Sequence, residues 1–293
     1  MTTENNLKMT SGTSSTFNNF ASHGKLYLVP APLDFGCDAL APITDVLPLG
    51  TLQVAASLQH WVCENAKTTR AVLKRVGDVV PLAAPIQQHS ITELPREVHK
   101  KGDHVGAQAG LQKSATLAGS KASAPAGAYD ARPLLKAALD GHNMGLISEA
   151  GLPAVADPGS SVVRAAHALG ITVVPLVGPC SLLLALAASG LNGQNFAFVG
   201  YLPTDAADRT KRIRELEALA VKTGQSQLFI ETPYRNAALW GALLASLQSN
   251  TLLTIASGLT LATSQVISKR VVDHKQSATL MFLDAPCVFG LGV

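Results

Sequence analysis

The stretch from Ala165 to Thr204 contains no Asp, Glu, Lys or Arg, and it constrains the fold more than any other feature of the chain. A transmembrane helix needs ~20 consecutive apolar residues. This stretch is interrupted by a Gly-Pro pair at 178–179 and by the polar run Asn192–Asn195. The β-branched segment Ile171–Val177 is typical of a strand, and the Leu- and Ala-rich segment Ser181–Ala188 is typical of a helix. A buried strand, a tight turn and a buried helix therefore fit better than a membrane span.

The composition indicates a folded protein of low charge. Hydrophobic residues make up 47% of the 293 residues and charged residues 15%, which excludes disorder along the whole chain. The four cysteines are scattered without a Cys-x-x-Cys pair, so we expect reduced thiols and no metal site. No basic region followed by an apolar run opens the sequence, so we expect a cytoplasmic protein without membrane association. The net charge of +3 permits an anionic partner without requiring one.

The chain divides by texture into a tail and two domains. Residues 1–23 are rich in Thr, Ser and Asn and are expected to form a disordered tail. Residues 24–191 alternate strand-like, loop-like and helix-like segments, which predicts an α/β domain with a mostly parallel sheet. Within this domain, residues 100–130 are dominated by Gly, Ala, Ser, Lys and Gln and predict a flexible insertion. Residues 192–293 predict a second, smaller α/β domain with a mixed sheet.

The individual elements follow from apolar periodicity and from Gly and Pro boundaries. Strands are expected at 25–29, 144–148, 171–176, 196–202, 228–231, 252–256 and 279–283. Helices are expected at 52–60, 67–75, 133–140, 160–169, 182–189, 209–221 and 235–247. The end of the first helix could instead be a strand that reaches Val62, and Ser160 or Ser161 is expected to cap the helix that follows.

Four loops that follow predicted strands are rich in Gly, Pro or small residues: Pro30–Leu33, Ser148–Pro153, Gly178–Ser181 and Glu231–Arg235. In open α/β sheets, ligands bind at the carboxyl ends of the strands. Small residues let a ligand approach the main chain, and Pro stiffens the loop. Each loop alone fits an ordinary turn, but the recurrence of all four indicates a ligand site.

Several common motifs are absent from the sequence. It contains no Gly-x-Gly-x-x-Gly and no Gly-x-x-x-x-Gly-Lys-[Ser/Thr], so a nucleotide phosphate site of those types is unsupported. It also lacks the Gly-x-Ser-x-Gly motif of the common serine hydrolases. These absences favour a ligand held by backbone and apolar contacts.

A series of motifs in a fixed order resembles the tetrapyrrole methylase superfamily, and most of all its branch of 16S rRNA ribose 2′-O-methyltransferases. The series covers the chain from about Lys25 to about Leu283. Its members are Leu26-Tyr-Leu-Val-Pro-Ala-Pro32, Ser148-Glu-Ala-Gly-Leu-Pro-Ala-Val-Ala-Asp-Pro-Gly159, Val174-Pro-Leu-Val-Gly-Pro-Cys-Ser181, Ala188-Ser-Gly-Leu191, Phe196-Ala-Phe-Val-Gly-Tyr-Leu-Pro203 and Ile230-Glu-Thr-Pro-Tyr-Arg235.

The resemblance implies a two-domain fold, a homodimer, and S-adenosyl-L-methionine as methyl donor in the cleft between the domains. It also implies which residues hold the donor. In the first domain these are Pro30, Ala31, Pro32, Leu33, Ser148, Ala150, Gly151, Gly178, Pro179, Cys180 and Ser181. In the second domain they are Tyr201, Leu202, Pro203 and Ala256.

The sequence departs from the branch on the side of the methyl acceptor. Ser148-Glu-Ala-Gly-Leu-Pro153 replaces the usual Ser-Asp-Ala-Gly-Thr-Pro, and Cys63-Glu-Asn-Ala-Lys67 replaces Ala-Glu-Asp-Thr-Arg. Ser257-Gly-Leu-Thr-Leu261 replaces Arg-Glu-Leu-Thr-Lys and loses its charges. Three functions stay open: an RNA methyltransferase acting on rRNA ribose, a methyltransferase of a small molecule such as a tetrapyrrole, and a donor-binding protein without catalysis.

Transfer to a ribose hydroxyl requires a group that removes a proton. Four carboxylates are candidates, namely Glu64, Glu149, Asp157 and Glu231, and Glu149 is the first choice because it lies in a donor loop at a strand end. Arg235 is expected to orient a phosphate or one of these carboxylates. For RNA phosphates, the candidates are Lys67, Arg70, Lys74, Arg75, Arg209, Lys211, Arg212 and Arg214.

Overall fold

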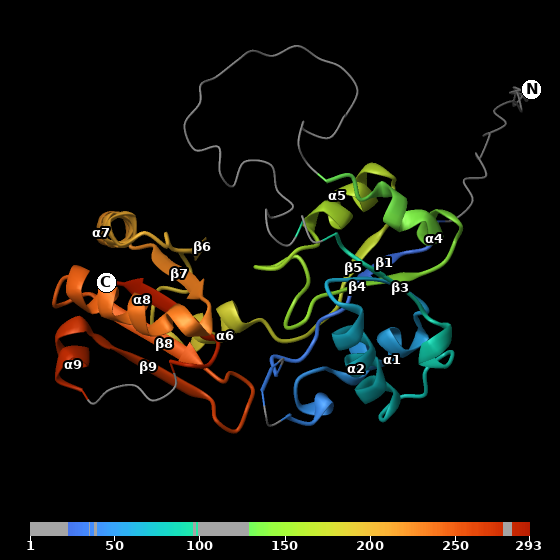
Figure 1. Cartoon of the computed structure of the whole chain (residues 1–293), viewed down its shortest axis with the longest axis horizontal. Helices are drawn as coiled ribbons and strands as arrows, with labels where there is room; N and C mark the ends of the chain where they lie inside the picture. Colours follow the sequence, from blue (N-terminus) through green and yellow to red (C-terminus); the bar gives the residue numbers. More distant parts are fainter. Residues whose placement is uncertain (1–22, 35, 38–39, 96–97, 99–128, 278–282) are drawn as a thin grey trace, which may run out of the picture.

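The computed structural model describes residues 23–34, 36–37, 40–95, 98, 129–277 and 283–293. These residues form two five-stranded sheets, with strand orders β3-β2-β4-β1-β5 and β6-β7-β10-β8-β9 (Figure 1). The predicted tail and the predicted insertion lie outside the described residues, apart from His23, Tyr129 and Asp130. The predicted α/β class with two sheets is confirmed.

The first sheet is parallel at every strand pair. Its strands are β1 (Leu26–Leu28), β2 (His60–Cys63), β3 (Ser90–Glu93), β4 (Met144–Ile147) and β5 (Val173–Pro175). Helices α1 (Leu49–Ser57) and α2 (Ala66–Gly77) contribute to one apolar cluster, and α4 (Lys136–Leu139) and α5 (Ser160–Ala168) contribute to another. All four residues of β4 are buried, as expected for a central parallel strand.

A glycine in β4 makes room for the largest buried side chain of this sheet. Gly145 is the register partner of Trp61 in β2, and Trp61 is 1% exposed. The Trp61 indole N–H donates to His89 Nδ1 at 3.3 Å. A Cβ placed on Gly145 would lie 2.4 Å from the Trp61 ring, so the two strands pack closely because this position has no side chain.

We expect Gly145→Ala to lower the free energy of unfolding by about 1–3 kcal/mol, because overpacking forces the indole or the strand to shift. Gly241→Ala is the matched control, since a Cβ there meets nothing within 4 Å and Gly241 lies inside a helix. That control is expected to gain ~0.5–1 kcal/mol. Urea unfolding of both variants measures the difference, and equal effects would contradict the packing argument.

The second sheet is mixed, with one parallel strand pair and three antiparallel pairs. Its strands are β6 (Phe196–Tyr201), β7 (Ser226–Glu231), β8 (Leu252–Ser257), β9 (Gln265–Arg270) and β10 (Cys287–Gly292). Helices α7 (Ala206–Thr223), α8 (Pro233–Ser246) and α9 (Val271–Gln276) contribute to one apolar cluster of this sheet.

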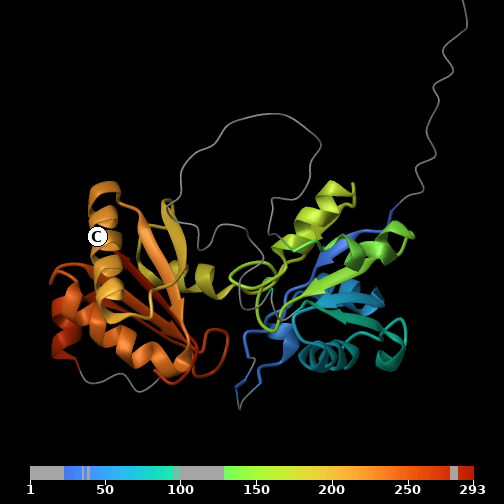
Figure 2. The same ribbon diagram turned by 45° about the horizontal axis from the view of Figure 1, so that its top comes forward.

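Helix α6 (Ser181–Ser189) follows the first sheet in the sequence but packs on the second. Its buried side chains Leu182, Ala185 and Leu186 share an apolar cluster with strands β7, β8 and β10. Both views place α6 beside the second sheet (Figures 1 and 2). The sequence assigned α6 to a first domain ending at Leu191. That boundary stays a prediction, and we propose that α6 belongs structurally to the second unit.

The uncharged stretch forms the predicted strand, turn and helix, as β5, residues 177–180 and α6. No helix among the described residues is long and apolar enough to cross a membrane. Some expectations differ from the structure. Helix α5 begins after Gly159, without a capping serine, and strands β3, β9 and β10 and helix α9 were not predicted. The expected strand at 279–283 lies outside the described residues except for Leu283.

Candidate functional site

Two of the predicted ligand loops are joined by their backbones. The first loop, Pro30–Leu33, follows β1, and the second, Ser148–Gly159, follows the neighbouring strand β4. The Ala31 N–H donates to Gly151 O at 2.9 Å, and the Gly151 N–H donates to Ala31 O at 3.0 Å. This reciprocal pair fixes the two loops against each other at the carboxyl edge of the sheet.

The third loop, residues 177–181, meets the first through a glycine. A Cβ on Gly178 would lie 2.3 Å from Cγ of Pro30, so the Pro30 ring occupies the space where a side chain would be. The Thr51 hydroxyl of α1 donates to Val177 O at 2.8 Å and anchors this loop from the other side. All three predicted first-domain loops therefore converge, as their strand order requires.

An ion pair anchors the end of the first loop to helix α2. Asp34, 6% exposed, lies 2.9 Å from an Arg75 guanidinium nitrogen, and Arg75 also donates to Ala41 O at 2.7 Å. Arg75 was expected to be a candidate phosphate contact. The structure instead commits its guanidinium to this internal pair, because a buried carboxylate needs a charged partner.

The three loops also contain polar groups that have no partner within the described chain and that could bind a small polar ligand. Ser148 Oγ is buried and has no hydrogen-bond partner among the described residues. Cys180, the N-cap of α6, makes no side-chain cap within the described chain, so the first N–H groups of that helix are not satisfied by it. The backbone N–H groups of Ala31 and Gly151 are already used in the pair that joins the two loops, and their role as donor contacts stays a prediction.

The second loop contains an unusual concentration of positive φ angles. Gly151 and Gly159 have φ of 69° and 135°, while Ala154 and Ala156 have φ of 64° and 65°. Non-glycine residues rarely adopt this conformation, and such strain of order 1–3 kcal/mol per residue is found mainly at functional sites. The strained segment encloses Asp157.

Three carboxylates gather around this loop. The Glu149 N–H donates to Glu64 Oε2 at 3.2 Å, and the Thr68 hydroxyl donates to Glu149 Oε1 at 3.4 Å. Burial, together with the negative charges of Glu64 and Glu149, raises the pKa of Asp157 to about 7. A carboxyl group with that pKa exchanges its proton near neutral pH, which suits a general base.

The second sheet presents its own polar groups at the ends of β6 and β7. Glu231, 6% exposed, accepts from Arg235 at 2.6 Å and from the Thr232 N–H at 2.8 Å. The pKa of the Tyr201 phenol is raised. Partial desolvation is the larger cause and the negative charge of Asp157 the next, and the side chain is nevertheless 55% exposed. Tyr201 is therefore within electrostatic reach of the first sheet's carboxylates. Arg235 is held by a carboxylate, as one of its two expected roles requires.

Two predicted donor residues of the second unit have buried side chains. Leu202 is 3% exposed and belongs to the apolar cluster beneath α7 and α8, whereas Ala256 is 1% exposed and lies in the cluster beneath α6. Leu202 could thus offer a ligand only its backbone.

Arg209, one of the candidate phosphate contacts, binds the backbone that follows Leu202. One of its guanidinium nitrogens donates to the Pro203 carbonyl at 3.5 Å and to the Thr204 carbonyl at 2.9 Å.

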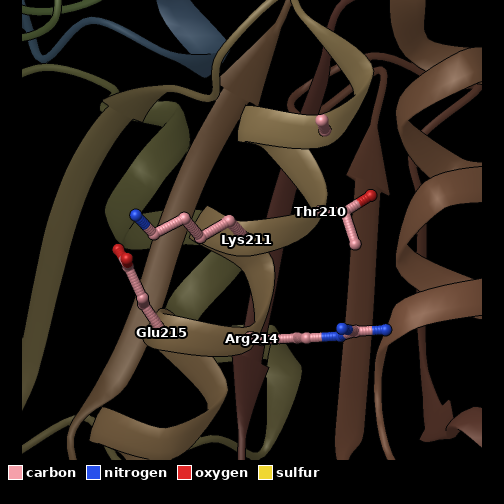
Figure 3. A pocket seen from close by; sticks show the side chains of 5 residues that line it. Thr210, Lys211, Arg214 and Glu215 are labelled. Atoms are coloured by element: carbon pink, nitrogen blue, oxygen red, sulfur yellow. The ribbon is translucent and has the colours of Figure 1, made fainter.

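Two surface hollows lie away from the three loops. One lies on α7 and is lined by Ala207, Thr210, Lys211, Arg214 and Glu215. Figure 3 shows Lys211 and Glu215 pointing to one side of the helix and Thr210 and Arg214 to the other. The second hollow lies at the opposite, amino edge of the first sheet, beside His60 and His142. Neither includes a predicted donor residue.

The model of the family described as Tetrapyrrole (Corrin/Porphyrin) Methylases matches residues 64–273. This match includes most of both sheets and two of the three converging loops. The chain belongs to the tetrapyrrole methylase family. The predicted superfamily is thereby confirmed.

Several curated relatives of this family member share the name "Ribosomal RNA small subunit methyltransferase I". The protein of that name from Mesorhizobium japonicum is 29% identical over 256 residues, which cover 86% of this chain and 70% of the relative. The protein from Escherichia coli O157:H7 is 34% identical over 73% of this chain and 58% of the relative. The protein from Pseudomonas aeruginosa is 43% identical, but over 32% of each chain. The chain thus spans less than two thirds of the last two relatives.

The fold of the family is also found in a solved structure. The crystal structure of the methyltransferase CobJ superposes with a TM-score of 0.52 and 16% sequence identity, covering 92% of this chain and 94% of that one. At this identity the likeness supports the two-sheet fold and nothing finer.

One of the four candidate carboxylates of this family member stands out in the structure, and it is Asp157. Glu149 was preferred because it lies in a donor loop at a strand end, and that preference stays a prediction. Asp157 is distinguished by its burial and by the two carboxylates near it. The sequence signal that could have indicated this is the Gly- and Ala-rich run around Asp157, in a loop with two prolines.

We expect the free energy of unfolding to depend on pH through Asp157. The pKa of this group is about 7 in the folded chain and 3.8 for the unperturbed carboxyl, so the folded state binds more protons between these values. The stability of the wild type therefore falls as the pH rises through this window. Asp157→Asn lacks the titration, so its stability relative to wild type should rise between about pH 4 and pH 8.

Urea unfolding at several pH values measures this difference. In Glu64→Gln, carboxyl-carbon NMR should show the pKa of Asp157 moved down, because one of the neighbouring negative charges is gone. If the stability difference between Asp157→Asn and wild type did not change with pH, the raised pKa of Asp157 would be contradicted.

Proposed function

We propose that the chain is an S-adenosylmethionine-dependent methyltransferase whose acceptor is RNA, at a ribose 2′-hydroxyl of rRNA. The observation that carries this proposal is the convergence of three small-residue loops at one sheet edge in a member of the tetrapyrrole methylase family. The shared name of its curated relatives supports the RNA acceptor. We also propose a homodimer, as the resemblance implies, and a cytoplasmic location, where an rRNA substrate would be found.

The donor would be held between the two sheets. In the first unit, Ser148 and the loops Pro30–Leu33 and Gly178–Ser181 would line it, with the buried Ser148 hydroxyl gaining a partner. In the second unit, Tyr201, the backbone of Leu202, Pro203 and the wall containing Ala256 would close on it. When bound, S-adenosylmethionine supplies a methyl group already activated by its sulfonium, so the protein's work is positioning and exclusion of water.

The acceptor hydroxyl must lose its proton as its oxygen forms the new bond to carbon. We propose that Asp157 takes this proton, with Glu149 beside it as the second proton-accepting carboxylate. Because the pKa of Asp157 is about 7, a large fraction of this group is ionised at neutral pH. Arg235 would then act by orienting Glu231 at the facing edge of the second sheet.

Exposed cations would hold the phosphates of the RNA. On α2 these are Lys67, Arg70 and Lys74, and on α7 they are Lys211 and Arg214. Arg75 is committed to Asp34, and Arg212 pairs with Glu215 at 3.3 Å. Contacts of this kind give affinity without base specificity and weaken as salt increases.

Donor binding tests the site directly. We expect calorimetry to show binding of S-adenosylmethionine or of its demethylated product to the wild type. Gly178→Ala should weaken this binding about tenfold or more, equivalent to ~1.4 kcal/mol, because the new Cβ displaces the third loop from Pro30. Gly241→Ala on α8 is the matched control and should bind as wild type does. No binding at high micromolar donor would refute the proposal.

Transfer of a labelled methyl group identifies the acceptor. With rRNA from a strain that lacks this protein, the wild type should label RNA, and Asp157→Asn should lower kcat about 10²–10⁴-fold while donor affinity stays unchanged. The kcat of the wild type should rise as the pH increases through about 7, because the base must be ionised. Glu149→Gln should move that transition to lower pH.

Other labelling patterns would lead to other functions. Label that enters only a small-molecule fraction would favour a small-molecule methyltransferase. Donor binding without any labelled acceptor in whole-cell extract would favour a binding protein that has lost catalysis. An unchanged kcat in Asp157→Asn would remove this residue from the proton-accepting role.

A further inference from the structure

The two most exposed aromatic side chains in the described part of the chain lie at the same edge of the second sheet. Tyr234 is 83% exposed and Tyr201 is 55% exposed. Strands β6 and β7 are parallel neighbours, with Tyr201 in register with Ile230. Tyr234 follows three residues after the end of β7, in the first turn of α8. The topology therefore brings both rings to the carboxyl ends of β6 and β7.

The backbone that carries Tyr234 is held firmly although its ring is in solvent. The next residue, Arg235, is bound to the buried Glu231 at 2.6 Å. The one after it, Asn236, is 0% exposed and donates to the carbonyls of Leu283 and Ala285, each at 2.8 Å. An exposed ring on a fixed backbone loses little freedom when a flat ligand covers it, so it is suited to binding.

The end of β6 lies near two of the carboxylates discussed above. Tyr201 is within electrostatic reach of Asp157 and Glu64 from the first sheet. A methyl acceptor has to lie between the donor and the group that takes its proton. Tyr201 belongs to the expected donor contacts, which leaves Tyr234 as the exposed aromatic ring next to it that has no assigned partner molecule.

We propose that Tyr234 stacks on an unpaired base of the RNA substrate and so positions the nucleotide for methyl transfer. This inference rests on the proposed function and adds the group that recognises the acceptor. Proteins that act on single-stranded or splayed-out RNA bases hold them on aromatic rings, and such stacking tolerates any base because every base has a flat π-face. The guanidinium of Arg235 is bound to Glu231, and lysine side chains have no flat face to stack on a base.

Steady-state methyl transfer tests the inference. Stacking of one base is worth a factor of about 5 to 150 in affinity, so Tyr234→Ala should raise KM for RNA by a factor in this range. Tyr234→Phe should keep the wild-type KM, because it retains the ring. Donor affinity and the thermal midpoint should stay unchanged in both variants, since the ring packs against little else.

Phe196→Ala is the matched control. Phe196 is 40% exposed on the same strand as Tyr201 but at its amino end, away from the site. Its KM for RNA should equal that of the wild type. An equal KM in Tyr234→Ala and wild type would overturn the inference, and so would a change in sedimentation that shows Tyr234 to be a contact between copies of the chain.

A second measurement separates this inference from the proposed function. Fluorescence anisotropy with a short unstructured oligoribonucleotide needs neither donor nor catalysis. Weaker binding by Tyr234→Ala than by wild type and Tyr234→Phe supports stacking even if the wild type fails to transfer methyl groups. Equal binding by all three overturns it, whatever the outcome of the donor-binding experiment.

Discussion

The reciprocal backbone hydrogen bonds between Ala31 and Gly151 are the constraint on which the rest of the site depends. Neighbouring parallel strands end at the same edge, but their loops would be free to diverge without a cross-link. This pair removes that freedom, and the packing of Pro30 into the space above Gly178 adds the third loop. The Asp34–Arg75 ion pair then fixes the far end of the first loop to α2. The site is therefore built on backbone that its own neighbours hold in place.

The low charge of the chain has the same origin. A parallel sheet covered on both faces needs apolar strands, so charged residues have no place within them. The carboxylates Glu64, Glu149 and Asp157 follow strands β2 and β4, and Glu231 ends β7. Partial burial of like charges is unfavourable, and the chain tolerates it in a loop that also carries strained backbone. This combination is expected where function, and not stability, determines the residue.

The sequence predicted the strands and helices whose signal is local. Continuous apolar runs identified β1, β4 and β5, and the charged amphipathic pattern identified α2 and α7. It did not predict β3, β9 and β10. Strands β3 and β9 are exposed or partly exposed and carry polar residues, and β10 contains Gly290 and Gly292, which disfavour a strand. The ion pair of Arg75 and the surroundings of Asp157 depend on tertiary contacts that the sequence pattern does not contain. The sheet that α6 packs on also depends on side chains distant in the sequence.

Helix α6 links the geometry of the third loop to the orientation of the second sheet. Its first residue belongs to the third loop of the first unit, while its buried face is packed into the second sheet. The helix is therefore fixed to the second sheet and continuous with the third loop. A rotation of one sheet against the other would change the geometry of residues 177–181. By thermodynamic reciprocity, a molecule that binds there preferentially in one orientation also selects that orientation of the sheets. Any change in how the two sheets are oriented would therefore be coupled to occupancy of this site.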